Sequence, residues 1–424
     1  MQETDERYGK YVQILKEELR PAMGCTEPIA IAYATARARA VLGCMPDRIL
    51  VEVSGNIIKN VKSVVVPHTG GLRGISAAVA AGAVAGDAER ELEVIADVSP
   101  AQIEAIKAFL DSTPIEVQLA DTPHVFDIAV TLHCESDSAF VRLVEHHTNL
   151  VCIRRNGETL YEKEAQSRAN NLTDRSCLTI EGIVDFADIV HPEDVSAALE
   201  RQIAFNMAIA EEGLCGVYGA NIGKMLLLQN PDDLYQKMRA YAAAASDARM
   251  NGCELPVIIN SGSGNQGITT SIPVIVCARE LQKSHEELLR ALCVANLVTI
   301  HLKTGIGRLS AYCGAVSAGC GAAAGVAYLQ GGRYDMISHT VVNALAMDSG
   351  IICDGAKASC AAKISSAVDA GLLALTMYQH GNQFFGGDGI VKKGVENTIA
   401  NVGRLARIGM LQTDREIIQL MLEN

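Results

Sequence analysis

The sequence contains no tryptophan, and aromatic residues make up only 4% of its 424 residues. Glycine is abundant instead, with 37 residues, and 49% of the chain is hydrophobic. Aliphatic side chains must therefore fill the interior, while small residues allow helices to approach one another closely. A chain of this length exceeds one ordinary hydrophobic core, so the sequence predicts two domains.

Positive charge is also scarce. The 36 Lys and Arg residues against 49 Asp and Glu residues give a formal net charge of −13. Nucleic acids require a basic face that neutralises their phosphates, so we expect no nucleic-acid partner. A small anionic substrate is still compatible with this charge, because the N-terminus of a helix can bind an anion within an acidic protein.

Targeting and membrane signals are missing as well. The first six residues are acidic and no apolar core follows them, so we expect no secretory signal. No run of about eighteen uncharged apolar residues predicts a membrane span. The apolar block from Gly314 to Leu329 is rich in Ala and Gly and is typical of a buried helix. We therefore expect a cytoplasmic protein with no membrane partner.

The pattern of apolar residues changes along the chain and predicts an α+β fold with two unequal domains. Residues 48–165 hold several strand-like runs and two helical segments, which is typical of a smaller α+β layer domain. Residues 166–424 are mainly helical. Residues 1–47 contain two further helical segments, which we expect to pack with the helical domain.

A glycine-rich segment, residues 260–267, contains the spacing GxGxxG after an apolar run, which can signal a dinucleotide site. Pro256 precedes that run and Pro273 interrupts the following helix, and both argue against such a site. A Ser/Gly/Asn nest whose backbone N–H groups hold a carboxylate is a better interpretation. A plain glycine-rich connector is the other possibility.

The sequence contains 13 cysteines, and a disulfide framework is not expected in a long chain without a secretory signal. Most should be small buried hydrophobic residues. Cys313, Cys320, Cys353 and Cys360 lie close together in sequence, without the tight pairs that zinc prefers. Their longer spacing suits an iron–sulfur cluster. Cys320 lies in a Gly/Ala-rich helical segment and is better explained by packing. Three ligands on a four-iron cluster would leave one iron free to act as a Lewis acid.

Another cysteine, Cys25, lies in a turn directly before a predicted helix. Thr26 suits the N-cap of that helix and Pro28 suits its first turn. A thiol at a helix N-terminus has a lowered pKa and becomes a usable base or nucleophile. The alternative is a small buried residue at the start of a helix.

Taken together, these segments resemble the L-cysteine desulfidases, a family related to the α-subunit of bacterial iron–sulfur L-serine dehydratases. The likeness runs almost end to end and is carried by Pro21–Pro28, Ala244–Met250, Asn260–Thr269, Arg308–Cys313, Cys353–Cys360 and Gln412–Arg415. The resemblance implies a lyase that removes sulfide from L-cysteine by β-elimination without pyridoxal phosphate, giving pyruvate and ammonia. It also implies a [4Fe–4S] cluster on Cys313, Cys353 and Cys360 and an active-site base at Cys25.

The sequence also predicts residues that bind the substrate, and it leaves three alternative functions open. The predicted substrate-binding residues are Asn56, Asn60, Thr148, Asn149, Ser263 and Asn265. An L-serine dehydratase would use the same chemistry with hydroxide as the leaving group. A non-catalytic iron–sulfur cysteine sensor would need a fourth ligand, such as Cys320, and a nicotinamide oxidoreductase would use Gly262, Gly264 and Gly267. The Ala/Gly-rich helical surface also makes a homodimer plausible.

Overall fold

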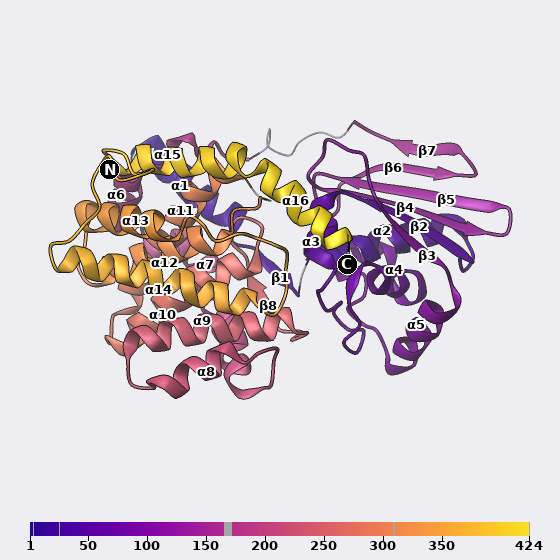
Figure 1. Ribbon diagram of the computed structural model, residues 1–424, viewed down its shortest axis with the longest axis horizontal. Helices are drawn as coiled ribbons and strands as arrows, with labels where there is room; N and C mark the ends of the chain where they lie inside the picture. Colours follow the sequence, from indigo (N-terminus) through magenta and orange to yellow (C-terminus); the bar gives the residue numbers. More distant parts are fainter. Residues whose placement is uncertain (3, 25, 165–171, 308–309, 424) are drawn as a thin grey trace.

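The computed structural model describes residues 1–2, 4–24, 26–164, 172–307 and 310–423, and it consists of two bodies of different construction (Figure 1). One body is a bundle of helices that holds the N-terminus and the later part of the chain. The other is smaller and combines a sheet with helices. This separation confirms the predicted α+β fold with a mainly helical domain.

The smaller body is built on a mixed six-stranded sheet of order β3-β2-β4-β5-β6-β7. β2 pairs parallel with β3, and all other neighbouring strands are antiparallel. The strands are β2 (Arg48–Val53), β3 (Ile115–Leu119), β4 (Asp127–Cys134), β5 (Asp137–Val144), β6 (Leu150–Arg155) and β7 (Glu158–Glu162). In β2 every second residue is fully buried (Ile49, Val51 and Val53), so one face of the sheet turns toward the helices.

The helices of the smaller body are held to one another by small residues. They are α2 (Thr26–Leu42), α3 (Gly55–Val61), α4 (Gly74–Ala85), α5 (Pro100–Ser112) and the short 3₁₀ helix η1 (Ala88–Glu93). A Cβ atom at Gly82 of α4 would lie 2.3 Å from the backbone oxygen of Ala32 in α2, so the two helices meet backbone to backbone. These helices and the sheet share one hydrophobic core.

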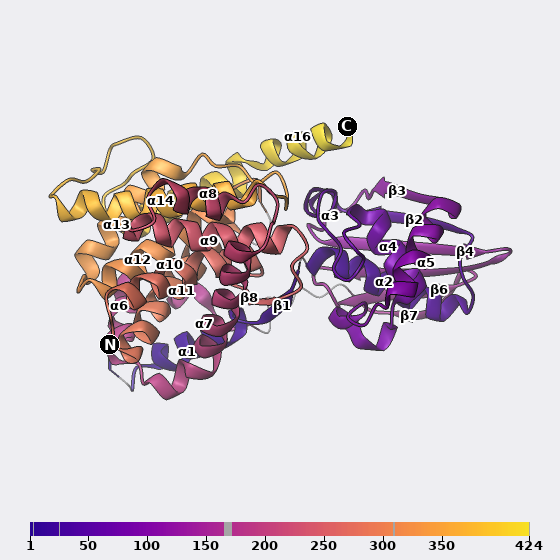
Figure 2. The same ribbon diagram turned by 90° about the horizontal axis from the view of Figure 1, so that it is seen from below.

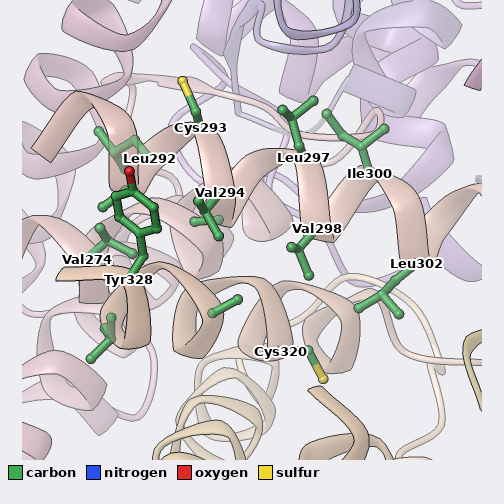
Figure 3. Packing of buried hydrophobic residues seen from close by; sticks show 14 of the residues in the cluster. Val274, Leu292, Cys293, Val294, Leu297, Val298, Ile300, Leu302, Cys320 and Tyr328 are labelled. Atoms are coloured by element: carbon green, nitrogen blue, oxygen red, sulfur yellow. The ribbon is translucent and has the colours of Figure 1, made fainter. Parts of the chain in front are cut away.

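The larger body is a helical bundle whose central helices are apolar on nearly all sides. Aliphatic side chains of α11 (His285–Ile306) and α12 (Gly314–Leu329) interdigitate between the two helices (Figure 3). Around them lie α1 (Glu6–Glu18), α6 (Ile180–Ile189), α7 (Pro192–Cys215), α8 (Ile222–Gln229), α9 (Leu234–Met250), α10 (Gly264–Glu280), α13 (Tyr334–Asp348), α14 (Cys360–Gln379), α15 (Val395–Arg404), the short 3₁₀ helix η3 (Arg175–Cys177) and the short π-helix η4 (Leu405–Gly409), which α16 (Leu411–Leu422) follows.

Two of these helices, α11 and α14, are long and apolar enough to cross a membrane by length and composition. In α11, 78% of the most apolar stretch is buried inside the helical body, and in α14 the share is 50%. Core helices of globular proteins have the same length and composition, so neither helix argues for a membrane span. The expected absence of a span remains a prediction.

The N-terminal helices are divided between the two bodies, which differs from the prediction for residues 1–47. α1 packs with the helical body, where Tyr11 contacts Phe186 edge to face at 5.4 Å between ring centroids. α2 instead belongs to the core of the smaller body and packs against α4, β4 and β5. The physical reason is that α2 is buried on nearly all faces, so it needs a partner on each side, and the sheet and α4 supply them.

Within the described residues, a short strand and the last helix lead from the helical body to the smaller one. β1 (Pro21–Met23) pairs antiparallel with β8 (Pro256–Ile258) and leads directly to α2. α16 leaves the helical body and reaches α3 of the smaller one, as both views show (Figures 1 and 2). There Ile418 packs so closely on Gly55 that a Cβ atom at Gly55 would lie 2.5 Å from its Cδ1, and Lys59 forms an ion pair with Asp414.

Candidate active site

Cys313, Cys353 and Cys360 line one cavity where the two bodies meet. The segments before the first two thiols run side by side, because the N–H of Cys313 donates to the Ile351 oxygen (3.0 Å) and the N–H of Cys353 donates to the Ala311 oxygen (2.6 Å). Cys313 is the N-cap of α12 and Cys360 is the first residue of α14. One paired loop and two helix N-termini therefore bring three thiols to a common space.

Burial favours the protonated thiol at Cys313 and Cys360. It raises the pKa of Cys313 to about 12, with the neighbouring Cys353 as the second cause. Burial also raises the pKa of Cys360. A coordinated metal reverses this preference, because it deprotonates its thiol ligands.

The donor set fits an iron–sulfur cluster rather than a single ion. Within the described ranges, no group of three or more His, Cys, Asp or Glu side chains is arranged to hold one metal ion. A cluster is larger and takes thiolates from separate loops, and the cavity, which opens to solvent, encloses about 910 Å³. Cys320 is only 1% exposed and lies among the apolar residues between the helices (Figure 3), in agreement with a packing role.

The glycine-rich segment lines the same cavity from the helical body and begins α10. Asn260 and Ser263 exchange backbone hydrogen bonds of 3.1 and 3.0 Å, and the Ser263 hydroxyl caps the helix by accepting from the N–H of Gln266 at 3.5 Å. Among the described residues, the strand before this turn, β8, pairs with β1 alone, and the pair is antiparallel. A dinucleotide site of the GxGxxG type requires a parallel βαβ unit, so the fold does not support the nicotinamide alternative.

Three predicted substrate-binding residues, Asn60, Ser263 and Asn265, line this cavity. The side-chain oxygen of Asn265 accepts from Arg249 Nη1 at 3.2 Å and from the Ser246 hydroxyl at 3.4 Å. Both contacts use the oxygen, so the NH₂ group of Asn265 is the end suited to a ligand carboxylate.

Three other predicted residues, Asn56, Thr148 and Asn149, are not among the residues that line this cavity. Asn56 lies on α3 and faces a neighbouring cavity of about 1640 Å³. Thr148 and Asn149 lie in the turn between β5 and β6, where the Asn149 amide donates to the Val144 oxygen at 2.7 Å. A hairpin turn favours the same polar residues as a binding site, so a substrate role for Thr148 and Asn149 stays a prediction that their position in this turn does not support.

Cys25 lies outside the described residues, but both of its neighbours are at the cavity. Thr26 lines it and begins α2. The backbone oxygen of Gly24 accepts from Arg249 Nη2 at 2.7 Å. Gly24 has φ +57°, and a Cβ atom there would lie 2.6 Å from Pro67, so the turn requires glycine.

Basic side chains that were not predicted from the sequence give the cavity its charge. They are Lys59, Arg249, Lys303 and Lys363. Glu27 is the single carboxylate among the described lining residues. Lys59 and Lys363 are paired with Asp414 and Asp354, which do not line the cavity, and cationic groups in its wall suit thiolates and an anionic substrate group. Two of these basic side chains carry a signal in the sequence, since Arg249 lies within the Ala244–Met250 segment of the family likeness and Lys59 interrupts an apolar helical stretch.

The chain is similar to known proteins over its whole length. The profile of the serine dehydratase alpha chain family matches residues 89–419. This chain belongs to that family. A UPF0597 protein of Desulfitobacterium hafniense is 57% identical, over 100% of this chain and 98% of the relative. UPF0597 proteins of Treponema denticola and Aeromonas hydrophila are 49% and 41% identical, over 99% and 98% of this chain and 99% and 96% of their own lengths.

Membership in the serine dehydratase alpha chain family makes the protein a lyase of the dehydratase type, from a family that depends on iron and sulfur. The matched range includes all three cavity thiols and the turn that opens α10. α2 and α3 precede it, and the UPF0597 relatives extend over them as well. The residues of both walls of the cavity therefore lie within the range that the UPF0597 relatives match.

In this dehydratase-like protein the cavity combines two kinds of group. The thiols can hold a metal cluster, and the basic side chains and the N-terminus of α10 can hold an anionic group. A lyase that removes a β-substituent from an amino acid also needs a base.

Proposed function

We propose that the protein is an L-cysteine desulfidase, which eliminates sulfide from L-cysteine without pyridoxal phosphate. The observation that supports this proposal is the convergence of Cys313, Cys353 and Cys360 on a cavity that is lined by basic side chains and adjoins the turn around residue 25. The products are sulfide and aminoacrylate, which reacts with water to give pyruvate and ammonia.

In this proposal Cys313, Cys353 and Cys360 hold a cluster of the [4Fe–4S] type. When bound, the cluster supplies a Lewis acid that stabilises the negative charge of the departing sulfide. The lysines of the cavity wall add positive charge around the same space.

Cys25 is the proposed general base. It precedes Thr26, the first residue of α2, and the N-terminus of a helix favours a thiolate over a thiol. The thiolate takes the α-proton of the substrate, and the electron pair left on Cα forms the double bond as the sulfide leaves. A positioned base contributes typically about 10²–10⁴-fold to the rate.

Ser263, Asn60 and the NH₂ group of Asn265 are proposed to orient the substrate, because they line the same cavity. The non-catalytic sensor is less consistent with the structure, since its fourth ligand, Cys320, is buried between helices.

L-Serine dehydratase is the second candidate, and it is favoured by the family description. The deciding experiment is anaerobic purification, an absorption spectrum, and kcat/KM for L-cysteine and L-serine measured through sulfide and pyruvate. We expect a brown protein with the higher value for L-cysteine. A higher value for L-serine would replace the desulfidase by a dehydratase, and an active protein free of iron would refute the cluster.

A further inference from the structure

Two buried polar atoms in the wall of this cavity have no hydrogen-bond partner in the part of the chain that the structure describes. They are Nε of Arg249 and Oε1 of Gln266. Their residues are only 9% and 4% exposed and both line the cavity. Among the described lining residues, no other has such an atom. A buried polar atom without a partner destabilises a protein, so its presence calls for a reason such as a ligand.

Arg249 reaches the cavity from the end of α9, and its other two nitrogens are engaged. Nη2 donates to the Gly24 oxygen and Nη1 to the Asn265 side chain. The guanidinium lies against Gly264, where a Cβ atom would be 2.4 Å from Nε. The unpaired donor is therefore located at the N-terminus of α10, where free N–H groups and the helix dipole favour a carboxylate.

Gln266 is placed on the other side of the same helix start, next to the thiols. Its side chain lies against Gly314, the residue after Cys313, where a Cβ atom would be 2.7 Å from the amide carbon and 2.9 Å from Oε1. No hydrogen bond engages this side-chain amide within the described residues, so rotation about its last bond can turn the oxygen to the cavity. In a wall rich in cations, this carbonyl is a neutral acceptor suited to an ammonium group.

We propose that Arg249 and Gln266 recognise the head group of an α-amino acid, Arg249 through the carboxylate and Gln266 through the ammonium. One unpaired donor and one unpaired acceptor in a common wall match a ligand that carries an acceptor and a donor on one carbon. A carboxylate alone or an amine alone would satisfy only one of them. The pair thereby orients the side chain of the substrate toward the thiols and selects amino acids over thiol acids and thiol amines. This inference rests on the proposed elimination from an amino acid, but not on the identity of the leaving group.

The test uses the holoenzyme, two variants and two truncated ligands. 3-Mercaptopropionate lacks the α-ammonium group, and cysteamine lacks the carboxylate. Gln266→Met is expected to raise KM for L-cysteine about 10–100-fold, the effect of a hydrogen bond to a charged group, and to leave the calorimetric Kd of 3-mercaptopropionate within about threefold. Arg249→Lys is expected to raise the Kd of 3-mercaptopropionate by a similar factor and to leave the Kd of cysteamine within about threefold.

Stability separates recognition from packing. Gln266→Met removes an unpaired buried atom, so the ligand-free protein is expected to have an equal or higher Tm. Gln236→Met is the matched control, because Gln236 is 7% exposed, is not among the cavity-lining residues and donates to the Leu226 oxygen at 2.7 Å. Gln236→Met should lower Tm and leave unchanged the KM of L-cysteine and the Kd values of 3-mercaptopropionate and cysteamine.

The inference is overturned if Gln266→Met lowers Tm and weakens all three ligands alike, which would mean a packing role, or if it changes none of them. Failure of the desulfidase proposal looks different. A wild-type protein that eliminates only L-serine would refute sulfide as the leaving group. The same comparison with L-serine, 3-hydroxypropionate and ethanolamine would then still test Arg249 and Gln266.

Discussion

The two walls of the cavity are constructed in different ways. The wall that carries the thiols belongs to a single helical core, in which α12 and α14 meet so closely that a Cβ atom at Gly319 would lie 2.4 Å from the Ala367 oxygen. The wall from the smaller body is held in place by few contacts across the boundary, among them Lys59 with Asp414. Cofactor binding and proton transfer therefore depend on separate parts of the molecule, and mutations should separate them.

The largest effect is expected from the wall that carries the thiols. Cys353→Ala removes one of three proposed ligands, so we expect loss of bound iron, of the brown colour and of nearly all elimination activity. Iron and acid-labile sulfide per chain measure the loss. Cys320→Ala is the matched control, since Cys320 is buried between helices and should be dispensable for iron. Full iron content in Cys353→Ala would contradict the assignment.

The opposite wall should show the complementary phenotype. Cys25→Ala removes the proposed base but no proposed ligand, so we expect the cluster to stay bound while kcat falls by about 10²–10⁴-fold. Single-turnover pyruvate formation together with the absorption spectrum measures both properties on one sample. Cys44→Ala, on the same body but not among the cavity-lining residues, should retain full kcat. Near-normal turnover of Cys25→Ala would give the base role to another group.

The same contrast explains which features could be predicted from the sequence. The thiols could, because Cys353 and Cys360 lie in one short segment and Cys313 begins a recognisable Gly/Ala helix. The turn at Ser263 and Asn265 could as well, since glycine-rich turns before helices have a clear local pattern. Local sequence describes the wall that comes from one core.

Features that depend on contacts between the bodies were missed. α2 was assigned to the wrong body because a helix that is apolar on all sides gives no indication of its neighbours. Lys59 pairs with Asp414 of α16, and Arg249 at the end of α9 donates to the Gly24 oxygen in the turn before α2. Both side chains therefore take their positions through contacts between the two bodies. Asn149 was assigned to the substrate because turn residues and binding residues share the same chemistry.

A smaller effect is expected from loosening the boundary between the bodies. Asp414→Asn removes the partner of Lys59, which is 2% exposed, so the free energy of unfolding should fall by about 2 kcal/mol. The iron content should remain, while kcat/KM falls because Lys59 lines the cavity. Chemical denaturation and iron analysis test this prediction. Glu416→Gln, an exposed residue of the same helix, is the control and should leave both unchanged.

The smallest effect concerns a charge inside the helical body. Burial raises the pKa of Asp247 to about 6, although it accepts from the N–H of Gly223 at 3.0 Å. The folded state thus binds its proton more tightly than the unfolded state, whose carboxyl has a pKa near 3.8. Stability contributed by the protonated group is lost as the pH rises across this window. Asp247→Asn keeps an acceptor without the charge. The Tm of the variant minus the Tm of the wild type should therefore increase by a few degrees from pH 4 to pH 7, the size expected for about 1 kcal/mol. Parallel Tm curves would mean that the carboxylate is better solvated than its burial implies.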